Sequence, residues 1–270
     1  MIRDMTIGQY FDTKSVIHGL DPRVKITGTF IYVISLFVFK SITGYFFVTL
    51  FLFLCISLSK IPLKYIMRGM KSIIFILFFT VFFQVFLTSG ETILFKWKFI
   101  TISLEGIKSG IFFGMRLIYL ILGTSLMTFT TTANQLTDGL EALLHPLIKL
   151  RVPVHEIAMT MSIALRFIPI LIEELDIIMD AQKARGADFE SGGLVRRTKA
   201  LIPVLIPLFV SAFRRADELA LAMEARCYTG GEGRTKMKPL KYRAGDIFAY
   251  FVAVVYFAGL VFVGRWLGGV

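Results

Sequence analysis

Charged residues are scarce in this 270-residue chain, at 18%, and the chain has only two cysteines and three histidines. Cys55 and Cys227 lie far apart in sequence, which argues against a disulfide or a cysteine-based metal site. The histidines do not form the pair on one helix face, with an acidic partner, that a metalloenzyme needs. No Gly-x-x-x-x-Gly-Lys-Ser/Thr segment occurs, so we expect no catalytic residue, no metal and no P-loop nucleotide site in this chain.

Apolar residues, in contrast, make up 56% of the sequence, with 27 phenylalanines among them, and the mean hydropathy is +0.72. A soluble domain has no place to bury so much apolar surface, so a lipid bilayer is the expected solvent. The net charge of +11 is not accompanied by an aromatic-and-basic stretch of the kind that binds RNA. The basic excess is therefore expected to set the membrane topology rather than to bind nucleic acid.

Five apolar stretches predict membrane-spanning helices, each near the lower limit of the ~17–25 residues that cross the hydrocarbon layer. They cover residues of about 24–41, 42–58, 73–89, 110–130 and 247–264. The segments before the first span and between the second and third carry eight Lys and Arg residues, against four in the other two connections. By the positive-inside rule, the N-terminus is predicted to be cytoplasmic. The predicted fold class is an all-α membrane protein with about five transmembrane helices.

The predicted organisation has three parts. Residues 1–130 form a membrane domain with the first four spans, residues 131–243 a cytoplasmic coupling domain, and residues 244–270 the final span. Within the cytoplasmic part, apolar residues recur at spacings of three and four over 154–185 and again over 194–226, which predicts two amphipathic helices. Each would be roughly 48 Å long. Both are too charged to span the bilayer, so we expect them to lie along its inner surface.

The two amphipathic segments end alike. A shift of 41 residues aligns Asp176 with Asp217 and Arg185 with Arg226. The ends read Ala184-Arg185-Gly186 and Ala225-Arg226-Cys227. A single arginine in the last turn of a helix is explained by the helix dipole, and glycine is a favoured helix stop. Two such ends favour a further role, because a guanidinium between small residues can enter a groove and bind a carboxylate in bidentate fashion. Two equivalent ends suit a two-fold or pseudo-two-fold partner, such as an ATPase dimer.

These ends resemble the coupling motifs of the transmembrane T-component (EcfT) of energy-coupling factor (ECF) transporters. Further segments that look like the family are Leu20 to Lys25, Ala164 to Pro169 with Glu173 or Glu174, Ala181 to Gly186, and Ala222 to Tyr228. Cys227 stands where the family more commonly has glycine or serine. The resemblance covers nearly the whole chain.

The resemblance implies a chain that is not itself an enzyme, in the cell membrane of a prokaryote. Its partners would be two ABC-type ATPase subunits, which use Mg-ATP, and one membrane-embedded substrate-binding S-component for a vitamin or another micronutrient. Residues 184–186 and 225–227 would bind the ATPases, with Arg185 and Arg226 seated in their grooves. This chain itself would bind no cofactor.

Two groups of residues are candidates for contact with the S-component. On the first amphipathic segment these are Met159, Met161, Leu171 and Ile172, because methionine repacks easily against a sliding partner. Gly106, Gly110 and Gly114 form a stripe of small residues at the start of the fourth span. Such a stripe allows close helix approach, most often inside the same protein, and contact of Gly110 and Gly114 with the S-component is the less favoured alternative.

Other functions predict features that this sequence has little of. A stand-alone secondary transporter would have inverted repeats of spans and ionisable residues at mid-membrane, and an intramembrane enzyme would have paired catalytic groups there. Here the repeat lies in the amphipathic segments, and the spans hold almost no charge besides Arg116. A permease of another ABC transporter type is the nearest alternative, although such permeases usually present one short coupling helix.

Overall fold

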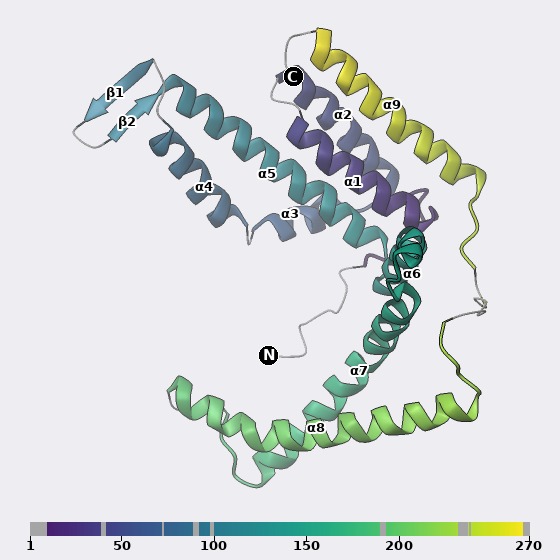
Figure 1. Cartoon of the computed structure of the whole chain (residues 1–270). Helices are drawn as coiled ribbons and strands as arrows, with labels where there is room; N and C mark the ends of the chain where they lie inside the picture. The colour runs from purple at the N-terminus through teal and green to yellow at the C-terminus, as the bar shows by residue number, and fades with distance from the viewer. Residues whose placement is uncertain are drawn as a thin grey trace. The chain divides into compact units, whose positions relative to one another are not determined.

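The computed structural model describes residues 10–38, 42–71, 73–88, 92–97, 100–189, 193–231, 237 and 239–266. Helices dominate these residues, with one short antiparallel hairpin (Figure 1). In chain order the elements are α1 (Pro22–Val38), α2 (Ile42–Ser59), α3 (Leu63–Lys71), α4 (Ile74–Leu87), β1 (Ile93–Trp97), β2 (Ile100–Ser103), α5 (Leu104–Thr130), α6 (Ala133–Leu144), the 3-10 helix η1 (His145–Leu150), α7 (Val154–Ala184), α8 (Leu194–Ala225) and α9 (Ala244–Trp266).

The chain forms two compact units. The first comprises residues 1–142 and 240–270, and the second comprises residues 143–239. The sequence placed these boundaries at 130/131 and 243/244. Most of α6 belongs to the first unit, because Gly139 lies so close to α1 that a Cβ there would be 2.9 Å from the Cβ of Pro22. The short helix α3 and the hairpin were not predicted from the sequence.

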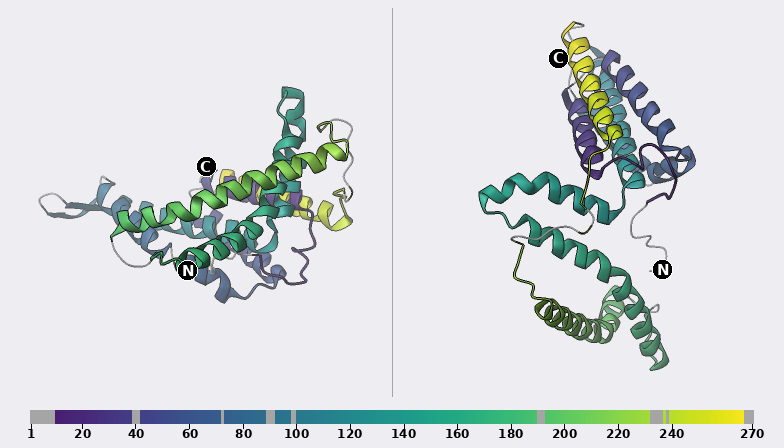
Figure 2. Two further views of the ribbon diagram at one scale, coloured as in Figure 1. Left: turned by 90° about the horizontal axis from the view of Figure 1, so that it is seen from below. Right: turned by 90° about the vertical axis from the view of Figure 1, so that its right-hand side faces the viewer.

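In the first unit, α1 packs between α5 and α9, and α2 also contacts both of these helices (Figures 1 and 2). The buried core of this bundle contains Tyr32, Leu36, Val48 and Leu260. A Cβ at Gly123 would overlap the ring of Tyr32, so only glycine lets α5 approach α1 this closely. The hydroxyl of Tyr32 donates to the carbonyl of Tyr119 at 3.0 Å and is thereby satisfied inside the bundle.

The outward faces of the bundle are apolar. Phe46, Phe75, Phe78, Phe251 and Phe262 are between 63% and 76% exposed. Soluble proteins rarely leave such large apolar patches uncovered, whereas lipid tails cover them at no cost. The prediction of an all-α membrane protein is therefore confirmed in class, with the small hairpin as an addition.

Length and composition make α5 and α9 long and apolar enough to cross a bilayer, and residues Gly44–Ser59 and Ile74–Phe86 form shorter apolar helices. The count of five spans and the cytoplasmic N-terminus remain predictions. α5 begins at Leu104, before the predicted start at 110, because the hydroxyl of Ser103 accepts the Gly106 N–H at 3.0 Å and caps the helix.

The glycine stripe of α5 lies against α4. A Cβ at Gly110 would come within 2.9 Å of Val85, and a Cβ at Gly114 within 3.0 Å of Val81. Both glycines are buried. The stripe therefore packs inside the first unit, which was the favoured interpretation of the sequence, and offers no exposed glycine surface to an S-component.

A buried polar cluster ties the start of α9 to the start of α1. The carboxylate of Asp246, 2% exposed, accepts the Asp21 N–H at 2.7 Å and the Arg243 N–H at 2.7 Å. Asp21 in turn pairs with Arg23 at 2.9 Å, and the Arg23 guanidinium lies over the Tyr242 ring. Burial alone would raise the pKa of Asp21, but hydrogen bonds from the Arg23 side chain and backbone outweigh it and the pKa is lowered. The segment Leu20 to Lys25 thus has a structural task in joining two helices.

Replacing Asp246 by alanine is expected to destabilise the first unit. The change leaves the buried Asp21 N–H without an acceptor, at a cost of about 1–3 kcal/mol, and removes the acceptor of the part-buried Arg243 N–H. Thermal unfolding of the detergent-solubilised chain measures the effect. Asp217→Ala is the control, because Asp217 is exposed on α8. Equal melting temperatures for Asp246→Ala and the control would contradict this account of the cluster.

Candidate functional site

The helices α7 and α8 begin and end within one residue of the two predicted amphipathic segments. Each runs through its internal prolines, Pro169 in α7 and Pro203 and Pro207 in α8, without a break in the helix. Both belong to the second unit, where they pack against each other and cross (Figures 1 and 2). The crossing is the place from which the two arginine-bearing ends extend.

An ion pair joins the two helices at the crossing. The guanidinium of Arg215 donates to the Glu174 carboxylate from Nη2 at 3.0 Å and from Nε at 3.2 Å. The pKa of Glu174 is lowered, chiefly by a hydrogen bond from the Ser211 side chain and further by Arg215, while partial burial opposes the shift. The Glu174 and Arg215 side chains are 21% and 38% exposed, so water screens the pair and its stabilising effect is modest.

Glu174 and Arg215 are also 41 residues apart, which is the offset that aligns the two helix ends. The same offset relates other contacts at the crossing. Leu171 and Ala212, which are equivalent, line one apolar groove between the helices. On one side of the crossing the Gln182 side chain donates to the Pro203 carbonyl at 3.5 Å. Their equivalents on the other side, Met223 and Ser162, line one groove. The crossing therefore has an approximate two-fold axis that passes near Glu174 and Arg215.

The two ends share one backbone geometry as well as one sequence pattern. After α7, the Gly186 N–H donates to the Lys183 carbonyl at 2.9 Å and the Ala187 N–H to the Gln182 carbonyl at 3.0 Å. After α8, the Cys227 N–H donates to the Glu224 carbonyl at 2.9 Å and the Tyr228 N–H to the Met223 carbonyl at 3.0 Å. Both are Schellman motifs, with Arg185 and Arg226 as the C-cap residues.

This geometry explains why a small residue follows each arginine. The residue after the C-cap is left-handed, with φ of 88° at Gly186 and 56° at Cys227. Glycine adopts such a φ freely, whereas a residue with a Cβ is strained there by about 1–2 kcal/mol. Cys227 therefore occupies a position where any residue other than glycine raises the energy of the backbone.

We call residues 174–185 of α7 and 215–226 of α8 the two arms. Each arm covers eleven residue steps from the crossing pair to its arginine, about 16 Å at the helical rise. Arg185 and Arg226 are exposed, and neither guanidinium has an ion pair within the described part of the chain. The flanking Ala184 and Ala225 are exposed as well and leave room around each guanidinium. Two equal arms thus present unpaired arginines.

The residues proposed from sequence to contact an S-component lie at different places on α7. Met159 lines a groove beside Arg226, and Leu171 lines the apolar groove against α8. Met161 is 45% exposed, and Ile172 is half-buried. These side chains therefore do not share one exposed face.

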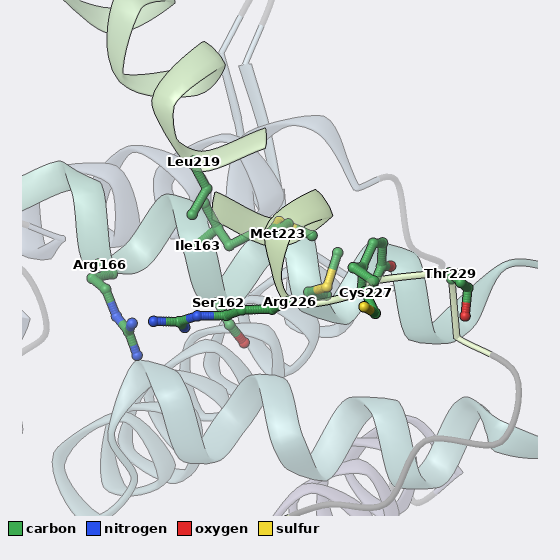
Figure 3. Close-up of a pocket in the computed structure, with 11 residues that line it drawn as sticks. Ser162, Ile163, Arg166, Leu219, Met223, Arg226, Cys227 and Thr229 are labelled. Atoms are coloured by element: carbon green, nitrogen blue, oxygen red, sulfur yellow. The ribbon is translucent and has the colours of Figure 1, made fainter. Parts of the chain in front are cut away.

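Sequence reasoning missed two features of this unit. Arg166 of α7 lies in the groove beside Arg226 (Figure 3). It belongs to the family-like segment Ala164 to Pro169, but sequence reasoning assigned it no role of its own. On α8, Ile202, Ile206, Phe209 and Phe213 form a stripe at helical spacing and are between 51% and 69% exposed. The spacing of these four residues could have revealed the stripe.

In the described residues, no group of three or more His, Cys, Asp and Glu could hold a metal ion.

The strain at Cys227 leads to a prediction about the two helix ends. Cys227→Gly should stabilise the end of α8 by about 0.5–1 kcal/mol, because relief of the left-handed φ exceeds the added freedom of glycine in the unfolded chain. Gly186→Ala should destabilise the end of α7 by a similar amount. Hydrogen exchange at the amides of Tyr228 and Ala187 measures both. Faster exchange at Tyr228 in Cys227→Gly would refute the shared geometry.

The ion pair at the crossing leads to a second prediction. A double-mutant cycle with Glu174→Gln and Arg215→Gln should give a coupling energy of about 0.2–1 kcal/mol at neutral pH. Because the pKa of Glu174 is lowered in the folded chain, this contribution is complete at neutral pH and is lost as the pH falls through that lowered pKa. Unfolding of the four proteins at neutral and strongly acidic pH tests this. A coupling energy that persists after acidification would contradict it.

Comparison with known proteins places this chain in a family. A family model described as cobalt transport protein (CbiQ) matches residues 13–237. The energy-coupling factor transporter transmembrane protein EcfT of Clostridium kluyveri is 52% identical over 256 residues, covering 94% of this chain and 95% of the relative.

Proteins of the same name from two other organisms are similar over almost their whole length. That of Ruminiclostridium cellulolyticum is 50% identical over 261 residues, covering 97% of each chain. That of Bacillus subtilis is 47% identical over 265 residues, covering 98% of this chain and 100% of the relative. The resemblance predicted from the paired helix ends is thus confirmed, and the chain belongs to the CbiQ family as a transmembrane component of an energy-coupling factor transporter.

Proposed function

We propose that this chain links two ABC-type ATPase subunits to a membrane-embedded, substrate-binding S-component in an importer for vitamins or other micronutrients. The family supplies the role of a transporter component that works in a complex. The observation that carries the finer proposal is the pair of equal arms, which leave one crossing and end in the same Schellman motif. Each ends in an exposed arginine that has no ion pair among the described residues.

The geometry of the arms suits a partner that is itself a dimer. A two-fold or pseudo-two-fold pair of ATPase subunits offers two similar grooves, and each arm would seat one guanidinium in one groove. Residues 184–186 and 225–227 form the contact, with Arg185 and Arg226 paired to carboxylates of the ATPases. The planar fork of arginine allows two parallel hydrogen bonds to one carboxylate, which holds both distance and orientation. Movement of the ATPases would then be passed to both helices at once.

The chemistry belongs to the partners in this proposal. Mg-ATP is bound and hydrolysed by the ATPase subunits, and this chain is non-catalytic and binds no cofactor of its own. The substrate is selected by the S-component. Met161 and the apolar stripe of α8 (Ile202, Ile206, Phe209 and Phe213) are among the exposed apolar surfaces of the second unit and favour an apolar membrane partner.

The proposed location is the cell membrane of a prokaryote, with several spans and a cytoplasmic N-terminus. Support for this orientation is the excess of Lys and Arg in the connections expected on the N-terminal side. It puts the second unit, with both arginine ends, on the side of the membrane where ATP is available.

Arg185→Ala combined with Arg226→Ala should detach the ATPases and abolish substrate uptake. Truncating an arginine that is paired to a partner's carboxylate typically costs about 2–5 kcal/mol, because the carboxylate is left without its counter-charge. The measurements are uptake by cells that express the whole complex and the amount of ATPase that co-purifies with the chain.

The matched control is Arg197→Ala combined with Arg214→Ala, which removes the same charge from exposed positions of α8 outside residues 184–186 and 225–227. This control should retain its ATPases and its uptake. Normal uptake and co-purification in the Arg185→Ala, Arg226→Ala protein would reject the proposed function.

A further inference from the structure

A groove of about 460 Å³ lies beside the end of the α8 arm, between that arm and the first half of α7. From α7 it is lined by Met159, Ser162, Ile163 and Arg166, and from α8 and the residues after it by Leu219, Met223 and Arg226 to Gly230. Figure 3 shows that the side chains of Arg166 and Arg226 extend toward each other across this groove. The groove therefore gathers two guanidinium groups that come from different helices.

Among the described residues, no carboxylate neutralises either guanidinium inside the groove. No residue that lines it carries a carboxylate, and neither arginine has an ion pair within the described ranges. Both side chains are exposed, so water screens their mutual repulsion. A carboxylate placed between them would relieve that repulsion and could accept charge-assisted hydrogen bonds from both guanidiniums. The groove is thus complementary to an acidic side chain.

At the other arm, the position equivalent to Arg166 carries no charge. Under the 41-residue offset between α7 and α8, Arg185 is equivalent to Arg226 and Pro207 is equivalent to Arg166. Pro207 is therefore the residue expected opposite Arg185, just as Arg166 lies opposite Arg226. The same offset places Pro203 where Ser162 stands. The two ends agree in backbone geometry and in their terminal arginines, but the position equivalent to Arg166 holds Pro207, which carries no charge. The side chains at these equivalent positions therefore depart from the approximate two-fold symmetry.

We infer that Arg166 and Arg226 together bind acidic side chains of the ATPase subunit that receives the α8 arm, and that Arg166 makes the two docking sites different in strength. This inference rests on the proposed function, because it takes an ATPase as the partner of Arg226. It adds a residue outside both terminal motifs to the contact. It also specifies the partner chemistry: the groove for the α8 arm carries more negative charge than the groove for the α7 arm.

Binding of the purified ATPase subunits to the chain in nanodiscs of neutral lipid tests the inference. Arg166→Gln should weaken binding about ten- to hundredfold, the range for a lost hydrogen bond to a charged group. Arg166→Lys should weaken it less, because the charge remains while the planar fork is lost. Arg197→Gln removes an exposed charge from the first turn of α8 and should leave the affinity unchanged.

Two double variants separate a shared contact from a general effect of charge. In an Arg226→Gln background, Arg166→Gln should have little further effect, because the acidic partner has already lost its main contact. In an Arg185→Gln background, Arg166→Gln should keep its full effect. Equal effects in the two backgrounds would overturn the inference.

Two further outcomes are decisive. If the effect of Arg166→Gln arises only after anionic lipid is added to the nanodiscs, a lipid headgroup binds Arg166 and the inference is wrong. If Arg185→Gln and Arg226→Gln weaken binding and Arg166→Gln does not, the inference fails while the proposed function stands. If none of the three variants weakens binding, the proposed function itself fails.

Discussion

The crossing of α7 and α8 determines where both terminal arginines lie. Each arginine is separated from the crossing by about three helical turns, and a helix of that length is stiff. A change of the crossing angle therefore moves Arg185 and Arg226 together. The crossing is held mainly by apolar side chains, among them Ile163, Leu171 and Leu219, and Val204 is 1% exposed. The Glu174–Arg215 pair is screened by water and supplies only a small part of the stability.

The first unit is stabilised by different means, and the difference follows from its solvent. Lipid tails are as apolar as leucine, so burying apolar surface between spans gives little gain. Close packing and satisfied polar groups have to do more. Gly110 and Gly123 bring α5 close to α4 and α1, and the Asp246 carboxylate joins α9 to α1 through backbone hydrogen bonds. Glycines and a buried carboxylate therefore lie where apolar contact alone would hold the helices only weakly.

Several parts of this structure could be predicted from the sequence because they depend on local patterns. The ranges of α7 and α8 follow from apolar periodicity, and their matching ends follow from Ala184-Arg185-Gly186 and Ala225-Arg226-Cys227. The groove beside Arg226 depends on residues 60 positions apart, Arg166 and Arg226, and no local pattern encodes that distance. The early start of α5 depended on the Ser103 cap, which an apolar count starting at 110 overlooks. Met159 and Met161 are two residues apart, so the helical repeat of 3.6 residues per turn already places them on nearly opposite sides of α7. The crossing determines which of these sides faces a groove.

The position in α8 that is equivalent to Arg166 of α7 holds Pro207, and this difference has a consequence for assembly. A body with an approximate two-fold axis can seat on a two-fold partner in two orientations that differ by half a turn. If the partner is the proposed pair of ATPase subunits and these are unlike, only one of these orientations places each arm on its own subunit. A difference of about 1.4 kcal/mol between the orientations populates the favoured one tenfold over the other. In the proposed complex, one extra guanidinium on one side would thus be enough to give a nearly symmetric platform a preferred direction of assembly.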